Sequence, residues 1–273
     1  MEPTGTALVT GASRGIGRAT ALELGLRGFD VIASMRNPED GEELANDAKQ
    51  AGVSLAIERL DVTAAGTWTA PEGLRVLVNN AAIELENHAF EHTPIEHWRL
   101  IFETNVFGLV DVTRRAIPSL RRAGGGVICN ITSCSTLVPM TFFAVYRASK
   151  AAISALGESL RTELADFGIR LIEIMPGAID TDMLAASRLL PEGASKPGYG
   201  ELGQRVRSNR ALAAEMTTPA SQAARQIVDA IVCDDAPLRN PCDPMGSGLL
   251  ASWRENSDEE MMQPMLALFA PES

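Results

Sequence analysis

The sequence predicts an α/β fold in which helices cover both faces of a parallel β-sheet. Short apolar runs of strand length alternate with longer amphipathic stretches along most of the chain. A glycine-rich turn, TGASRGIG at 10–17, joins the first apolar run to the first helical stretch. The chain has 273 residues, a length at which a single α/β domain can bury a large core.

Strands are expected where apolar residues follow one another almost without interruption, as in TALVTG and IRLIEIMPG. Near-continuous apolar strands that alternate with helices are typical of a parallel sheet buried on both faces. We therefore expect a single doubly wound Rossmann domain with about seven strands. The strands that the sequence places are 6–11, 30–35, 53–61, 74–82, 125–133 and 169–177.

Helices are expected between these strands, where apolar residues recur with helical spacing. Gly28 and Gly52 end the first two, and Pro94 stands in the first turn of the third. Between residues 61 and 74 glycine and proline leave room for a stunted helix only. The predicted helices are 15–28, 38–52, 94–124, 144–168 and 219–232.

The C-terminal third is less regular. Residues 180–216 have no clean period and are expected to form a flexible substrate loop, and 236–273 form a C-terminal extension of the single domain 1–273. Ser257 and Glu260 predict a capping box for a tail helix. The apolar face of that helix is expected to pack on its own domain; it comprises Met262, Met265, Leu266 and Phe269.

Composition excludes several classes of function. With 24 basic and 35 acidic side chains the formal charge is −11, which argues against nucleic acid or a membrane surface as a partner. The cysteines at 129, 134, 233 and 242 show no close spacing, so we expect reduced thiols and a cytoplasmic protein. The acidic N-terminus does not resemble a signal peptide.

The turn TGASRGIG predicts a dinucleotide site, because it follows a buried strand and opens a helix. Gly11 allows a tight turn, Gly15 lets a pyrophosphate approach the backbone, and Gly17 permits close helix–strand packing. An NAD site would place a carboxylate at the end of the second strand, where this chain has Arg36. Arg36 and Arg14 could instead meet a 2′-phosphate, which favours NADP(H) and leaves NAD(H) as the alternative.

Two side chains on the helix 144–168 are either a surface pair or a proton donor with its activator, and their spacing alone does not decide between these alternatives. Tyr146 and Lys150 are four residues apart and share one helix face, where an ammonium would lower the pKa of the phenol. Ser133 ends the fifth strand, at the edge where open α/β sheets bind ligands, and its hydroxyl could polarise a carbonyl.

In order and spacing, a set of motifs resembles the short-chain dehydrogenase/reductase family over roughly residues 5–235. They are TGASRGIG, LDVT at 60–63, NNAA at 79–82, TNVFG at 104–108, ITSCS at 131–135, YRASK at 146–150 and PGAIDT at 176–181. The resemblance implies that Ser133 binds the substrate carbonyl, Tyr146 is the acid–base, Lys150 binds the nicotinamide ribose and Asn105 holds a water near the lysine. It also implies a cofactor site that comprises Gly11, Ser13, Arg14, Gly15, Ile16, Gly17, Arg36, Asn37, Asp61, Val62, Asn79, Ala81, Tyr146, Lys150, Pro176, Gly177, Ile179 and Thr181.

The substrate side is expected to be apolar. LVPMTFF at 137–143 lies between Ser133 and Tyr146, so Phe143 should edge the site together with Met183. Leu184, Leu189 and Leu190 could close over it. This pattern favours a hydrophobic ketone, aldehyde or secondary alcohol.

The segment HAFEH at 88–92 matches a zinc-peptidase pattern, H-x-x-E-H. That pattern needs a continuous helix, and Thr93-Pro94 follows at once, so His88 and His92 are predicted to be loop residues near the substrate entrance and no metal is expected.

The sequence thus predicts an NADP(H)-dependent oxidoreductase that interconverts a carbonyl and an alcohol. A catalytically silent NADP(H)-binding regulator of the same fold is the alternative. Alanines along 144–168 allow close helix approach, and relatives in the family often pair through this helix and 94–123. A homodimer or homotetramer is therefore expected.

Overall fold

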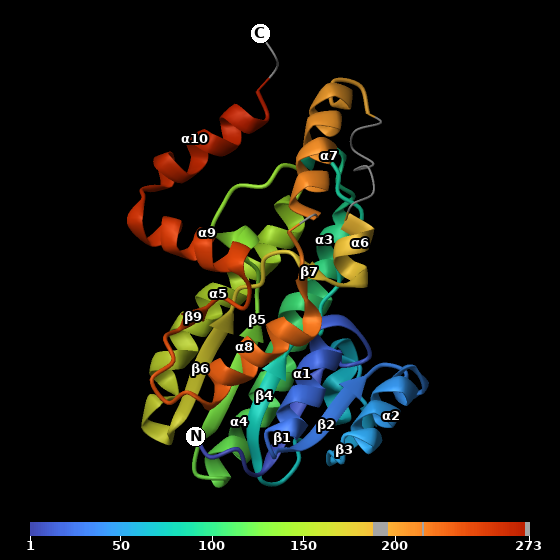
Figure 1. Ribbon diagram of the computed structural model, residues 1–273, viewed down its shortest axis with the longest axis vertical. Coiled ribbons are helices and arrows are strands. Elements are labelled where there is room, and N and C mark those ends of the chain that lie inside the picture. The colour runs from blue at the N-terminus through green and yellow to red at the C-terminus, as the bar shows by residue number, and fades with distance from the viewer. Residues whose placement is uncertain (188–195, 215, 271–273) are drawn as a thin grey trace.

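The computed structural model describes residues 1–187, 196–214 and 216–270. A seven-stranded sheet forms its centre, in the order β3-β2-β1-β4-β5-β6-β9, and each adjacent pair is parallel (Figure 1). The strand order reverses between β1 and β4, so the predicted doubly wound fold is confirmed. The strands are β1 (Thr6–Thr10), β2 (Asp30–Met35), β3 (Leu55–Arg59), β4 (Leu74–Asn79), β5 (Gly126–Ile131), β6 (Ile169–Ile174) and β9 (Arg239–Asn240).

Successive side chains of the strands enter two separate cores, one on each face of the sheet. Val9 of β1 packs in the core below α1 (Gly15–Leu26), α2 (Glu42–Gln50) and α8 (Ala220–Val232). Its neighbour Leu8 packs in the other core, below α4 (Leu109–Arg122) and α5 (Ala144–Glu163). Because both faces are covered, the strands can be apolar throughout, as the sequence indicated.

The helix predicted over 94–124 is present without a break over 95–122, but it changes type along its length. It consists of α3 (Ile95–Phe102), a π-helical segment (Glu103–Gly108) and α4. The wide turn coincides with Asn105, whose buried side chain bonds to the backbone of Ile83 rather than lying along the helix. π-Helical turns of this kind often occur at functional sites. Short 3₁₀ turns cover Pro38–Gly41, Val62–Thr67, Phe90–His92, Cys134–Thr136 and Ala165–Phe167.

The expectation of a flexible loop over 180–216 is wrong for much of this segment. It contains α6 (Asp182–Ser187) and α7 (Gly200–Ala214), and β7 (Ile179–Asp180) pairs with β8 (Thr218–Pro219). Within 200–209, where the side chains of α7 are described, Gly203 and Val206 are buried, and this stripe is too narrow to produce an apolar period. Leu189 and Leu190 lie outside the described residues.

The C-terminal extension contributes two helices, α9 (Pro244–Glu255) and α10 (Asp258–Leu268), beyond the carboxyl edge of the sheet (Figure 1). The capping box of Ser257 and Glu260 is confirmed. The predicted apolar face of α10 is only partly correct: Met265 and Phe269 are half-buried, but Met262 and Leu266 are 38% and 57% exposed, and Met261 is buried instead.

Besides the pairing of β9 with β6, a buried carboxylate fastens this extension to the loop after β6. Asp243 caps α9 by accepting the amide of Gly246 at 2.9 Å, and its second oxygen accepts the amide of Gly177 at 2.6 Å. Asp243 is 6% exposed, so both bonds are shielded from water. Among the described residues, no helix is long and apolar enough to cross a membrane.

Candidate active site

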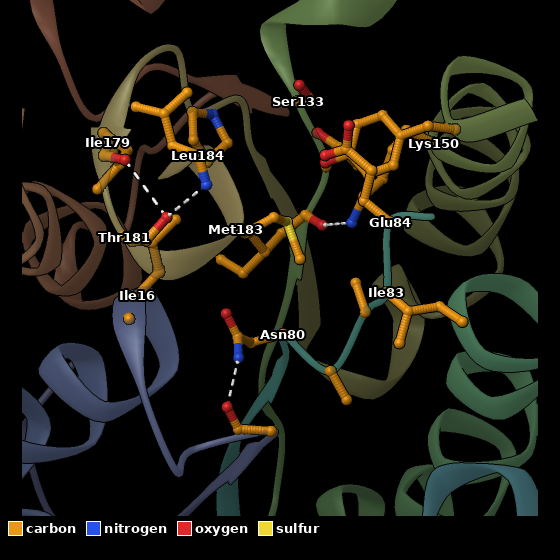
Figure 2. Close-up of a pocket in the computed structure, with 18 of the residues that line it drawn as sticks. Ile16, Asn80, Ile83, Glu84, Ser133, Lys150, Ile179, Thr181, Met183 and Leu184 are labelled. Carbon is orange, nitrogen blue, oxygen red and sulfur yellow. Dashed lines mark hydrogen bonds between the residues drawn. The ribbon is translucent and has the colours of Figure 1, made fainter. Parts of the chain in front are cut away.

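A cavity of about 690 Å³ opens at the carboxyl ends of the central strands and runs from the glycine turn to α6 (Figure 2). This is the edge at which doubly wound sheets bind ligands, and the volume suits a cofactor together with a small substrate. Most of the predicted site residues line it, namely Gly11, Ser13, Arg14, Gly15, Ile16, Arg36, Asn37, Asp61, Val62, Ala81, Ser133, Phe143, Tyr146, Lys150, Pro176, Gly177, Ile179, Thr181 and Met183.

Three of the predicted residues, Gly17, Asn79 and Asn105, do not line the cavity. Asn79 was expected beside the adenine ribose, but its side chain is buried in the sheet, where it donates to Thr113 Oγ1 and Asn130 Oδ1, each at 2.9 Å. Alternation along β4 explains the difference, because successive side chains point to opposite faces. Asn80, the first residue after the same strand, lines the cavity in its place.

The glycine turn is shaped by contacts that exclude side chains. Gly11 has a φ of +65°, and a Cβ there would lie 2.7 Å from Ala81 Cα. A Cβ on Gly17 would lie 2.5 Å from the carbonyl oxygen of Gly11 and 2.3 Å from Asn80 Nδ2. That amide in turn donates to the carbonyls of Thr10 and Gly11, as Figure 2 shows in part. Gly17 therefore lies behind the turn, outside the lining of the cavity.

Ser133 and Lys150 lie at one end of the cavity (Figure 2), and Tyr146 joins them through a hydrogen bond with Ser133. Ser133 follows β5, and its hydroxyl caps a 3₁₀ turn by accepting the amide of Ser135. Tyr146 and Lys150 extend from the first turns of α5, and Lys150 Nζ lies 5.6 Å from the centre of the tyrosine ring. The ammonium donates to the carbonyl of Ile131 at 2.8 Å, so its position is fixed by β5.

Asn105 joins the wall of the cavity to the helix that carries the tyrosine. Its amide accepts the N–H of Ile83 at 2.8 Å and donates to the carbonyl of Ile83 and to Ser149 Oγ. Ser149 Oγ in turn donates to the carbonyl of Tyr146 at 2.7 Å. Asn105 is thus a positioning residue in this structure, and its role in holding a water stays a prediction.

Charged side chains of both signs also line the cavity, among them Arg14, Arg36, Asp40, Asp61 and Asp182. Arg36 follows β2 and is exposed at the rim, and Arg14 Nε lies 3.9 Å from a carboxylate oxygen of Asp182. No carboxylate ends β2, but Asp40 of the next 3₁₀ turn also lines the cavity.

Comparison with known proteins agrees with this arrangement. A family model described as short chain dehydrogenase matches residues 5–190. The chain belongs to the short-chain dehydrogenase family. The uncharacterized oxidoreductase YusZ of Bacillus subtilis (strain 168) is 40% identical over 192 residues, which are 66% of this chain and 67% of that protein.

Two further relatives of this short-chain dehydrogenase are informative. The 3beta-hydroxysteroid dehydrogenase 1 of Eggerthella lenta is 36% identical over 197 residues, which are 68% of this chain and 75% of that protein. A crystal structure of a short-chain dehydrogenase from Streptomyces avermitilis superposes with a TM-score of 0.75 at 28% identity, and covers 97% of this chain and 95% of that one. Membership in this family means that the chain is an oxidoreductase and that it uses a nicotinamide cofactor.

The electrostatics of this short-chain dehydrogenase differ in one respect from the sequence expectation. Burial raises the pKa of the Tyr146 phenol, the charge of Glu84 raises it further, and a hydrogen bond with Ser133 lowers it. The net direction is upward, whereas Lys150 was expected to lower the pKa. The phenol therefore retains its proton at neutral pH, which is the form a proton donor needs.

The pH dependence of cofactor use is expected to follow Lys150. Burial lowers the pKa of its ammonium to about 8, against an opposing effect of Glu84. Below that pH the group is charged and can donate to a ribose hydroxyl, and above it the charge is lost. We expect kcat/KM for the cofactor to fall about tenfold per pH unit above pH 8 in rate measurements on the wild type.

The control for this pH dependence is Lys150→Arg, whose guanidinium stays charged over the same range. Its overall activity should be lower, but its profile should show no break near pH 8. A wild-type profile that stays flat through this region, or an identical break in Lys150→Arg, would assign the titration to another group.

Sequence reasoning missed several lining residues. Glu84 comes directly after NNAAI, just past the end of β4, and this position could have predicted that it lines the cavity. Met245, Leu249 and Met265 come from the C-terminal extension, and no local pattern connects them with the cavity. His88 and His92 do not share a helix face: His88 packs on His97 and His92 on Tyr199.

Proposed function

We propose that this chain is an NADP(H)-dependent oxidoreductase that interconverts a hydrophobic ketone or aldehyde and the corresponding alcohol. The observation that carries the proposal is a single cavity that is lined by Ser133, Tyr146 and Lys150 and also by Arg14 and Arg36. The two arginines can neutralise a 2′-phosphate, and Arg36 stands where an NAD site would place a carboxylate.

The protein's own groups support the chemistry in the direction of reduction. When bound, the reduced nicotinamide supplies a hydride to the carbonyl carbon. The Ser133 hydroxyl donates to the carbonyl oxygen, where negative charge develops, and Tyr146 delivers the proton that completes the alcohol. Lys150 binds the nicotinamide ribose and places a positive charge near the phenolate that Tyr146 becomes. The reverse direction uses the same groups with the proton returned to Tyr146.

The substrate class follows from the lining beyond the catalytic groups. Val138, Met140, Phe143, Met183 and Leu249 line the cavity with apolar surface. An apolar wall recognises bulk and shape, which favours hydrophobic carbonyl compounds over small polar acids. The resemblance to a hydroxysteroid dehydrogenase supports this class. A panel of hydrophobic ketones with NADPH tests it through the loss of the reduced-nicotinamide absorbance.

The preference for NADP(H) is expected to depend on Arg36. Arg36→Ala removes a charged donor to the 2′-phosphate, which should weaken NADPH binding by about 10- to 100-fold and leave NADH binding almost unchanged. Binding titrations with both cofactors measure this. Arg59→Ala is the matched control, because Arg59 lies beside Met35 in the sheet register and does not line the cavity.

The outcome also decides between the two cofactors. If NADH binds more tightly than NADPH in the wild type, Asp40 is the better candidate for the ribose contact and the enzyme is NAD(H)-dependent. If NADPH binds tightly and no carbonyl compound is reduced, the chain is the silent regulatory protein.

We also propose that residues 1–273 act as one catalytic domain in a cytoplasmic homodimer or homotetramer. Side chains from 180–216 and from the 236–273 extension line the same cavity, which supports a single domain. Leu100 and Phe107 are 54% and 58% exposed, and Ala151 and Ala155 are exposed on α5, so both expected pairing helices carry uncovered apolar surface.

A further inference from the structure

The chain has three histidines, and all of them lie within residues 88–97. The structure brings two of them together with a carboxylate, in a combination that the H-x-x-E-H pattern did not indicate. The rings of His88 and His97 have centroids 5.3 Å apart, and His88 Nε2 lies 3.9 Å from Glu86 Oε2. One ligand atom from each of Glu86, His88 and His97 can be chosen so that all lie within 4.8 Å of one another.

We propose that Glu86, His88 and His97 bind a divalent transition metal ion of the Zn²⁺ class. Two imidazole nitrogens and one carboxylate oxygen form a ligand set that Zn²⁺ accepts, with a further position left for water or another donor. This proposal departs from the expectation, drawn from the sequence, that the chain has no metal site.

To bind the metal ion, the ligand atoms of the three residues must move slightly closer together. Ligand atoms on a tetrahedral Zn²⁺ ion lie about 3.3 Å apart, because each is about 2.0–2.2 Å from the metal. The present separations must therefore shorten by about 0.5–1.5 Å. Glu86 can supply much of this movement, since its side chain is 70% exposed, whereas the side chain of His88 is 7% exposed and held by its surroundings.

Two independent features support a ligand at this place. A small cavity lies among these side chains and is also lined by Glu84, Thr93 and Tyr146. Nδ1 of His97 is buried and makes no hydrogen bond with any described residue. Buried polar atoms normally have a partner, and a metal ion in this cavity would provide one.

The position of the cluster indicates what the ion would do. Glu86 and His88 belong to the segment after β4, which also carries the cavity residues Ile83 and Glu84. His97 belongs to α3, which leads into the π-helical segment with Asn105. Asn105 already links the π-helical segment to Ile83 by hydrogen bonds. The metal ion would therefore form a second link between the segment after β4 and the helix that begins with α3. It would stabilise the substrate side of the cavity.

The test uses the full chain, freed of metal by dialysis against a chelator. Co²⁺ serves as the spectroscopic probe, and the melting temperature is measured with and without Zn²⁺. We expect a visible Co²⁺ absorption band that saturates at one ion per chain, and a Zn²⁺-dependent rise in melting temperature.

Substitutions of the proposed ligands test whether the metal ion binds at this site. His97→Gln and Glu86→Gln should each weaken binding of Co²⁺, the former by at least about 100-fold, because even indirect partners of a metal site contribute 10- to 100-fold. His92→Gln is the matched control and should bind as the wild type does. Glu86→Gln guards against loss of folding, since its side chain is exposed. Cys233→Ser removes the one exposed thiol among the described residues and should also leave binding unchanged.

Two results would overturn the proposal. One is a wild type with neither the absorption band nor a change in melting temperature. The other is a band that is lost equally in His92→Gln or in Cys233→Ser, which would place the metal elsewhere.

Discussion

Tyr146→Phe is expected to lower kcat by about 10³-fold while the protein binds NADPH almost as the wild type does. The substitution removes the hydroxyl that supplies the proton and keeps the ring that packs in the cavity wall. General acid catalysis of this kind contributes about 10²- to 10⁴-fold to a rate. The measurement is steady-state reduction of the best ketone from the panel, together with an NADPH binding titration on both proteins.

The chain provides a matched control for this experiment, because it has only one other tyrosine. The Tyr199 hydroxyl donates to Glu91 Oε1 at 2.8 Å, and Tyr199 does not line the cavity. Tyr199→Phe should therefore keep kcat within about twofold, since it removes a single exposed hydrogen bond. A Tyr146→Phe protein with unchanged kcat would remove Tyr146 from the mechanism, whatever the effect of Tyr199→Phe.

Gly17→Ala is expected to damage both the fold and the cofactor site, although Gly17 does not line the cavity. The added methyl group would lie 2.5 Å from the carbonyl oxygen of Gly11 and 2.3 Å from Asn80 Nδ2, and neither group can withdraw easily. Asn80 is itself bonded to Thr10 and Gly11. Relief requires the first turn of α1 to move away from the glycine turn.

We expect the free energy of unfolding to fall by about 1–3 kcal/mol, as it does when a methyl group is forced into a packed interior. The dissociation constant for NADPH should rise at least about tenfold, because the turn that receives the pyrophosphate is displaced. Urea unfolding and cofactor titration measure the two effects. Gly66→Ala is the control, since no atom lies within 4 Å of a Cβ at that position. Equal effects in the two variants would contradict this explanation.

Local patterns predicted the parts of the fold that depend on short segments. Each of the six predicted strands is present, because a buried parallel strand must be apolar over its whole length and the sequence displays this directly. The candidate catalytic residues could be predicted for the same reason. Helix spacing places Tyr146 and Lys150 on one face, and the end of a strand places Ser133 at the edge of the sheet.

Other features depend on distant residues and were not visible in the sequence. Asn79 and Asn80 are adjacent and chemically identical, so only the register of β4 decides which one enters the cavity. The π-helical turn at Asn105 exists because its amide bonds to Ile83, 22 positions earlier. The helix α7 was missed because it buries a narrow stripe, and Met265 because an extension brings it back to the cavity.

The bond between Asp243 and Gly177 has a consequence for the order in which the protein matures. Gly177 belongs to the loop proposed to seat the nicotinamide, and its partner lies 66 positions later in the chain. As the polypeptide is synthesised from its N-terminus, the sheet from β3 to β6 can assemble while this loop still lacks its anchor. The loop at Gly177 therefore gains this anchor only after the chain has been made as far as Asp243, well after the sheet strands β1 to β6.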